Sequence, residues 1–259
     1  MDLEFEKLEL LGEGMGSRVY KVRSMYEQKI FALKMVEKSF VETEMNKDFL
    51  LREYQLQKLL NHPNIVRSLT FFETENHLCF LLEYCGNETL QDRLELMGGK
   101  FTESQCRFWI KQILNAIGVI HAAQIIHRDV KLSNMFIAED NTLKVGDFGF
   151  ATAMEDIDED VLCGTPNYLP PEAIEYRIYG TFTDIWSIGV CLYIMLTGVS
   201  PFQGTTHDDT LRNVQRCRVH MPPFISDNAR TFIIECMQKD HTRRSSSYDL
   251  QRHPFLDGY

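Results

Sequence analysis

A polar octet, HRDVKLSN from His127 to Asn134, lies between two short apolar runs and concentrates reactive side chains in a loop. Loops of this composition rarely serve packing. Asp129 can accept the hydrogen bond of an attacking hydroxyl and orient it in line with a phosphorus atom. Asn134 offers a neutral oxygen to Mg²⁺, and Asp147 of the later segment KVGDFGFA adds a hard carboxylate ligand, with Phe148 packed inward behind it. The two segments together predict metal-assisted phosphoryl transfer.

A lysine and a glutamate upstream could hold the phosphates. Lys34 ends the apolar run FALK, and Glu53 follows 19 residues later on a predicted helix. A cation buried on a strand needs an anionic partner. Phosphate oxygens and Glu53 would supply it, so we expect Lys34 to bind the α- and β-phosphates while Glu53 holds Lys34.

The segment LGEGMGSRVYKV places three glycines, Gly12, Gly14 and Gly16, between two strand-like runs. Glycine lets the backbone approach phosphates without side-chain obstruction. The spacing G-x-G-x-x-G would put the third glycine at position 17, where the chain has Ser17. The glycine loop is therefore a weaker signal than the two segments above, and a bare hairpin turn is the alternative.

The elements that must position these residues follow from hydrophobic periodicity. Residues 5–36 contain short runs typical of β-strands, and the segments IVRSLTFFE and HLCFLLEYC predict two more strands. Within residues 46–60, apolar residues recur near helical spacing and predict a helix. Beyond residues 83–86 the pattern is mainly helical, and the apolar stretch at 186–199 is too short to span a membrane and predicts a buried helix. We expect one two-lobed α+β unit.

These motifs together resemble the eukaryotic protein kinase catalytic domain from about Phe5 to Phe255. Three further features fit the same pattern: the segment LPPE ending at Glu172, the aspartate Asp184 on the apolar helix that would brace the loop 127–134, and Arg244, placed to pair with Glu172. The resemblance implies an antiparallel sheet plus one helix in an N-lobe (1–82), a hinge (83–86) and a mainly helical C-lobe (87–259). It also implies ATP, with Mg²⁺, as the bound nucleotide. The adenine would lie on the backbone from Glu83 to Cys85, in an apolar slot with these neighbours: Leu11, Val19, Ala32 and Leu82.

The same resemblance indicates a serine/threonine kinase. Lys131 follows Asp129 by two places in the form typical of that class, and the hydroxyl of Thr165 in GTPNY can bridge the two. The segments LCGTPNYLPPE, KLSN and DFGFAT most resemble the polo-like kinases, with aurora kinases as the alternative. The chain ends soon after HPF, so we expect either an excised catalytic domain or a protein without polo-box domains.

Three departures from the family pattern alter the expected control and specificity. Val161 stands where related kinases carry a phosphorylated threonine, and the acidic run 158–160 before it is a candidate substitute for the phosphate charge near Arg128. A solvated acidic loop is the alternative. Thr89 and Ser133 replace carboxylates that would select arginine in a substrate. Phe150 directly follows DFG, and in related kinases a large residue at this place accompanies a preference for serine over threonine as the acceptor.

Composition narrows the expected partners. The chain carries a formal net charge of −10, which argues against general nucleic-acid binding, and its seven cysteines lack any CxxC pair. The N-terminus carries no readable secretory signal, so we expect a cytoplasmic or nuclear protein without membrane association, with the centrosome or spindle implied by resemblance. A regulatory or docking partner is left open. The competing functions are a pseudokinase scaffold and a small-molecule kinase.

Overall fold

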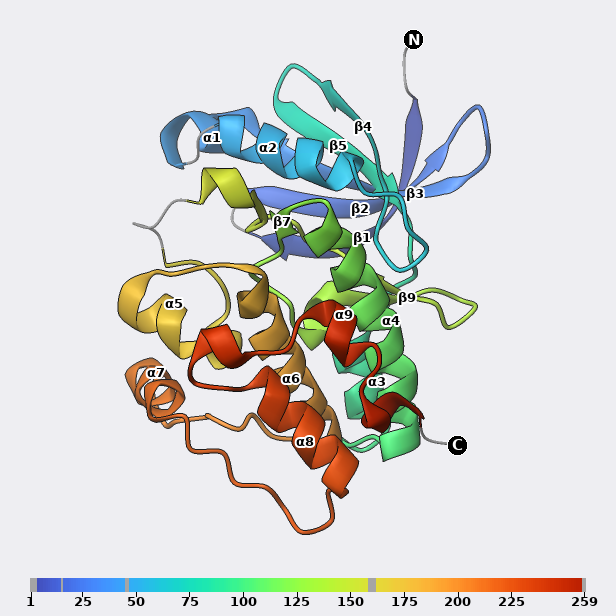
Figure 1. Cartoon of the computed structure of the whole chain (residues 1–259). Coiled ribbons are helices and arrows are strands. Elements are labelled where there is room, and N and C mark those ends of the chain that lie inside the picture. Colours follow the sequence, from blue (N-terminus) through green and yellow to red (C-terminus); the bar gives the residue numbers. More distant parts are fainter. Residues whose placement is uncertain (1–3, 15, 45–46, 158–161, 258–259) are drawn as a thin grey trace.

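The computed structural model describes residues 4–14, 16–44, 47–157 and 162–257 of the chain. Its upper part in Figure 1 is an antiparallel sheet in the order β1-β2-β3-β5-β4. Alternate side chains of β5 pack on opposite faces of this sheet. Leu78 and Phe80 pack toward the helices, whereas Cys79 and Leu81 pack on the other face. The strands are β1 (Phe5–Gly14), β2 (Ser17–Ser24), β3 (Ile30–Glu37), β4 (Ser68–Glu73) and β5 (His77–Glu83).

Among the described residues of this part of the chain, two helices rather than the single predicted one accompany the sheet: α1 (Lys38–Glu44) and α2 (Lys47–Lys58). The helix expected over 46–60 corresponds to α2. The expectation of one helix was wrong because α1 has only seven residues, too few to show a period. Packing stabilises it, as Val41 is buried and Phe40 lies against the same apolar cluster.

The lower lobe is built around α6 (Thr181–Thr197), which is buried along nearly its whole length and packs against α4 and α8. The predicted buried helix is thus confirmed. Side-chain caps begin several of the surrounding helices, with Thr102, Thr206 and Ser226 each accepting a backbone hydrogen bond. The other helices are α3 (Leu90–Leu96), α4 (Glu103–Ala122), α5 (Pro171–Tyr176), α7 (His207–Arg216), α8 (Asp227–Cys236) and α9 (Ser247–Leu250).

Short strands between the lobes fix the positions of the two loops that carry Asp129 and Asp147. β7 (Ile125–Ile126) pairs with β10 (Thr152–Ala153), while β6 (Glu88–Thr89), β8 (Met135–Ile137) and β9 (Leu143–Val145) form a second small sheet. Residues 127–134 therefore connect β7 to β8, and residues 146–151 connect β9 to β10. Single 3-10 turns occur at Leu132–Asn134, Met154–Asp156, Pro166–Tyr168, His241–Arg243 and Pro254–Asp257.

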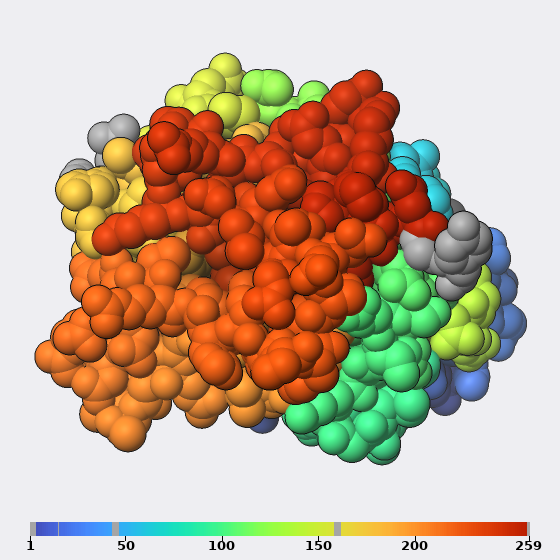
Figure 2. Space-filling view, turned by 60° about the horizontal axis from the view of Figure 1, so that its bottom comes forward, coloured from blue at the N-terminus to red at the C-terminus, as the bar shows by residue number. Residues whose placement is uncertain are grey.

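The two-lobed α+β architecture predicted from the sequence is confirmed. Figure 2 shows the base of the lower lobe, where segments after residue 200, orange to red, cover most of the face beside the green start of α3 and α4. Among the residues described, no helix is both long and apolar enough to cross a membrane. The seven cysteines are free thiols, and all but Cys217 are buried.

Candidate active site

The side chains of Lys34 and Glu53 meet between β3 and α2. Lys34 Nζ lies 2.7 Å from Glu53 Oε1, and the two side chains are only 19% and 15% exposed. Burial alone would lower the pKa of Lys34, but Glu53 and then Asp147 raise it above its ordinary value. The ion pair that the sequence predicted is present, and the lysine stays cationic at neutral pH.

Asp129 lies at the centre of a hydrogen-bonded group in the loop after β7. Its Oδ1 accepts from the Thr165 hydroxyl at 2.7 Å and from the Thr165 backbone N–H at 3.1 Å. Lys131 Nζ donates to Thr165 Oγ1 at 2.9 Å and lies 2.7 Å from Asp129 Oδ2. The structure therefore contains the bridge that the sequence predicted between Asp129, Thr165 and Lys131.

Asn134 and Asp147 present oxygen atoms to the same cavity. The Asn134 amide nitrogen donates to the Asp129 carboxylate and carbonyl, both at 3.0 Å, which leaves its Oδ1 as the oxygen available to a cation. Asp147 adopts a left-handed backbone conformation with φ 58° and is supported by the inward Phe148, which is fully buried against His127. An amide oxygen and a carboxylate that face one cavity near the cationic Lys34 fit Mg²⁺, which favours oxygen ligands.

The loop of residues 127–134, which carries Asp129, is held in place by Asp184 at the start of α6. Its two carboxylate oxygens accept the backbone N–H groups of His127 and Arg128, each at 2.9 Å, and His121 Nε2 lies 2.9 Å away. Burial alone would raise the pKa of Asp184, but His121 and then His127 bring it below its ordinary value. The ionised carboxylate holds Arg128 at φ 63°, a conformation that non-glycine residues rarely adopt.

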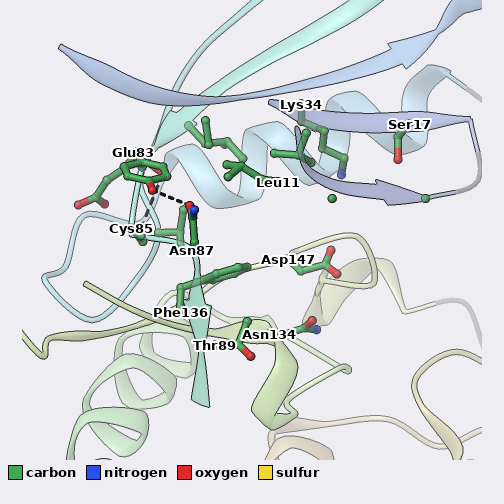
Figure 3. Close-up of a pocket in the computed structure, with 18 of the residues that line it drawn as sticks. Leu11, Ser17, Lys34, Glu83, Cys85, Asn87, Thr89, Asn134, Phe136 and Asp147 are labelled. Atoms are coloured by element: carbon green, nitrogen blue, oxygen red, sulfur yellow. Dashed lines mark hydrogen bonds between the residues drawn. The ribbon is translucent and has the colours of Figure 1, made fainter. Parts of the chain in front are cut away.

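A cavity of about 640 Å³ lies between the lobes, within the range of small-molecule sites. Figure 3 shows Leu11 on its upper side, Phe136 on its lower side, and Glu83 and Cys85 at one edge. Burial raises the pKa of the Cys85 thiol to about 12, so this thiol is an apolar wall at neutral pH. The predicted residues that line the cavity are Leu11, Gly12, Gly14, Val19, Ala32, Lys34, Glu53, Leu82, Glu83, Cys85, Asn134 and Asp147.

Gly16 is the predicted nucleotide contact that does not line this cavity. Its φ is +68°, and a Cβ built on it would lie 2.2 Å from the ring of Phe40 on α1. The third glycine therefore allows close packing against α1, which the spacing could not reveal.

The sequence reasoning missed several lining residues, among them Val66 and Phe136. Met135 and Ile137 on either side of Phe136 are buried, so strand alternation points Phe136 to the opposite face. The run Met135–Ile137 is apolar throughout, so the sequence alone did not mark Phe136 as a lining residue.

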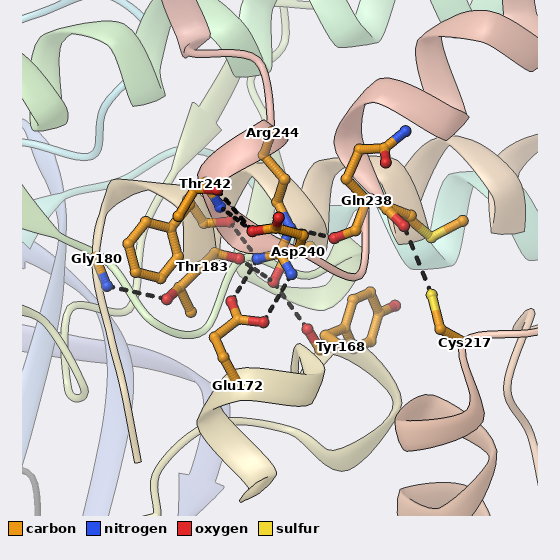
Figure 4. A network of polar contacts seen from close by, with 12 residues as sticks. Tyr168, Glu172, Gly180, Thr183, Cys217, Gln238, Asp240, Thr242 and Arg244 are labelled. Carbon is orange, nitrogen blue, oxygen red and sulfur yellow. Dashed lines mark hydrogen bonds and ion pairs between the residues drawn. The ribbon is translucent and has the colours of Figure 1, made fainter. Parts of the chain in front are cut away.

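The scaffold contacts expected around the site are also present. Arg244 makes a paired contact with the Glu172 carboxylate, including Nη2 to Oε2 at 2.7 Å, and both side chains are buried (Figure 4). Arg128 donates from Nε to the Phe150 carbonyl at 2.6 Å. Val161 and the acidic run 158–160 lie outside the described residues.

Comparison with known proteins matches residues 5–256 to the protein kinase domain. The chain belongs to the protein kinase family. Serine/threonine-protein kinase PLK2 of Mus musculus is 34% identical over 253 residues, covering 96% of this chain and 37% of that protein. Serine/threonine-protein kinase polo of Drosophila melanogaster is 32% identical over 256 residues, covering 98% and 44%. Serine/threonine-protein kinase PLK4 of Drosophila ananassae is 32% identical over 255 residues, covering 98% and 33%.

These relatives confirm the predicted resemblance of this kinase domain to the polo-like serine/threonine kinases, in preference to the aurora-like alternative. The chain spans between 33% and 44% of the length of the three relatives.

Proposed function

We propose that this kinase domain transfers the γ-phosphate of ATP to serine and threonine hydroxyls of proteins. The observation that carries the proposal is the pair of Asp129 and Lys131 bridged through Thr165. Asp129 also accepts a hydrogen bond from Asn134, which lines the cavity together with Lys34. A hydroxyl, a nucleotide and a divalent cation would each meet suitable side chains in one place.

In this proposal each residue has one task. Lys34, held by Glu53, binds the α- and β-phosphates, and Asp129 accepts the hydrogen bond of the substrate hydroxyl and orients it for attack. Lys131 stabilises charge near the transferred phosphate. Mg²⁺, when held by Asn134 and Asp147, would neutralise charge developing on the phosphate oxygens. The nucleotide base would occupy the slot above Phe136, and residues 1–82, 83–86 and 87–259 would be the N-lobe, hinge and C-lobe.

The residues next to the hinge support a substrate preference that does not require arginine. Glu88 is the carboxylate nearest the expected arginine-selecting position, and Arg93 already pairs with it, including Nη2 to Oε2 at 2.6 Å. Thr89 caps α3 by bonding to Asp92. We infer that acidic flanking residues are better tolerated than basic ones and, with Phe150, that serine is preferred. Dominant selection of arginine three residues before the acceptor in a peptide library would overturn this inference.

Regulation and cellular role rest on the resemblance to polo-like kinases. We infer a cell-cycle role, with action at the centrosome or spindle and a protein partner for docking, away from nucleic acid and membranes. We also infer that the acidic run 158–160 reduces the need for a phosphate near Arg128. Phosphatase treatment tests the last point, because a large loss of activity traced to a phosphosite in residues 146–172 would contradict it.

The transfer itself is tested with radiolabelled ATP, Mg²⁺ and casein. Asp129→Asn should lose about a hundredfold or more of the labelling rate, because general acid–base and positioning effects of this kind are worth about 10² to 10⁴. Asp208→Asn is the matched control, since its side chain is 86% exposed and it lies on α7. Equal labelling by wild type and Asp129→Asn would refute the assignment. Binding of a fluorescent ATP analogue without any labelling would instead support a pseudokinase scaffold.

A further inference from the structure

Three side chains from different parts of the chain bond to one another at the mouth of the cavity. The amide nitrogen of Asn87 donates to both carboxylate oxygens of Glu9, each at 3.2 Å. The amide oxygen of Asn87 accepts from the Tyr84 hydroxyl at 2.5 Å. Glu9, Tyr84 and Asn87 all line the cavity, and Figure 3 shows Asn87 with its bond beside the Glu83–Cys85 segment.

The chemistry of the groups fixes the direction of these bonds. An ionised carboxylate can only accept, so the nitrogen of the Asn87 amide must face Glu9 and the oxygen must face Tyr84. Lys21 Nζ lies 4.8 Å from the centre of the Tyr84 ring, and Lys21 is the β2 residue opposite Glu9 in the β1–β2 register. Each donor therefore meets an acceptor, and the Asn87–Glu9 contact joins segments 78 residues apart in sequence.

The position of Glu9 gives this contact a consequence for the nucleotide. Glu9 precedes Leu11 by two residues on β1, the strand that covers the cavity (Figure 3). Phe5 packs one end of β1 against the apolar cluster of the sheet, but no residue of the strand is fully buried, and the part that covers the cavity is held by its ladder to β2 and by surface contacts. Asn87 belongs to the segment that leads from β5 into β6 and α3. Its bonds to Glu9 therefore tie the covering strand to the opposite wall of the opening.

We propose that Glu9, Asn87 and Tyr84 form a latch that holds β1 over bound nucleotide and slows its release. Asn87 is the positioning residue, because it alone contacts both of the others. The inference rests on the proposed use of this cavity for an adenine nucleotide. The contacts are exposed to solvent, so the latch opens readily and changes the lifetime of the complex without blocking entry.

The latch is tested by exchanging its groups in the full chain and measuring release of the fluorescent nucleotide mant-ADP by stopped flow. Asn87→Asp places a carboxylate opposite Glu9 and should accelerate release about three- to tenfold, the range expected for losing one or two exposed polar contacts. Adding Glu9→Gln to Asn87→Asp restores an amide–carboxylate pair with the roles reversed, and the Tyr84 hydroxyl can still donate. The double variant should return to within about twofold of wild type.

Two further readouts separate a latch from general damage to the fold. Repulsion between two exposed carboxylates is screened by salt, so the Asn87→Asp effect should shrink in 1 M NaCl. Its KM for ATP should rise while the rate of transfer at saturating ATP does not fall. Asn228→Asp on α8 is the matched control and should leave release unchanged, and thermal unfolding should be the same for all variants.

Release from Asn87→Asp at the wild-type rate, or release from the double variant as fast as from Asn87→Asp, would overturn the latch. Absence of mant-ADP binding by wild type would overturn both the latch and the proposed function. Binding with a working latch but no labelling of casein would overturn only the proposed transfer.

Discussion

Replacing Arg244 with methionine removes the cation that satisfies both carboxylate oxygens of Glu172 inside the lower lobe. The side chain of Arg244 is fully buried and that of Glu172 is 4% exposed. Arg244 also donates to the Gln238 carbonyl at 2.9 Å and the Phe182 carbonyl at 3.1 Å, and its guanidinium lies 4.9 Å from the Trp186 ring centre. Methionine would keep much of the apolar contact and supply none of the hydrogen bonds.

The expected magnitude follows from leaving one charge buried alone. Removing one partner of a buried ion pair costs about 3–5 kcal/mol of unfolding free energy, because the remaining charge loses its compensation. In a chain of this size, each kcal/mol lowers the melting temperature by about 2–4 °C. We therefore expect Arg244→Met to melt roughly 6–20 °C below wild type, and Arg244→Met with Glu172→Gln to recover part of the loss because no unpaired charge is then buried at this position.

Urea denaturation followed by circular dichroism measures the change, with the midpoint and the slope compared between variants. The neighbouring Arg243 offers a matched control. Its side chain is 76% exposed and its contact to Asp240 is 3.6 Å long, so Arg243→Met should be indistinguishable from wild type. A loss below about 1 kcal/mol for Arg244→Met would refute the reasoning, since the buried carboxylate would then not depend on its partner.

Two more predictions concern the N-lobe and its junction with the C-lobe. Burial and then Lys144 hold the pKa of His62 below its ordinary value, so its contribution to stability is present above the unfolded pKa of about 6.5 and is lost as pH falls through the lower folded value. In His62→Asn an amide oxygen keeps an acceptor for the Asn64 N–H without titrating, so urea titrations at about pH 7 and pH 5 should differ less than for wild type. An unchanged difference would contradict this role. Gly16→Ala should raise the KM for ATP and lower the melting temperature more than Gly98→Ala, because only the first added Cβ meets a neighbour; equal effects would show that backbone strain alone acts.

The ion pair in the candidate active site could be predicted from the sequence, because a charged side chain that is buried needs a partner of opposite charge. Lys34 ends a predicted apolar strand and Glu53 lies on the predicted helix that follows it, and their ion pair was expected from that placement. The sheet and the long helices were readable because their periods persist for many residues. Helix α1 was not, because packing of Phe40 and Val41 stabilises it instead of a repeated pattern.

Other contacts depend on the exact closeness of segments that no local pattern brings together. Asn87 is an unremarkable turn residue until β1 lies beside it, and the Glu88–Arg93 pair spans the start of α3, where helical spacing does not apply. The displacement of Gly16 from the cavity likewise depends on where α1 sits. Geometry at the rim of the cavity therefore had to come from the structure.

Asp184 grips the loop through backbone N–H groups, and every residue type except proline supplies the same group. The hydrogen bonds from the loop to Asp184 therefore do not depend on which side chains most loop positions carry. Substitutions at Thr89, Ser133 or Phe150, where we propose that substrate preference is set, would leave this support in place. Kinases with this support would be able to change their substrate preference by single substitutions while the position of Asp129 is kept.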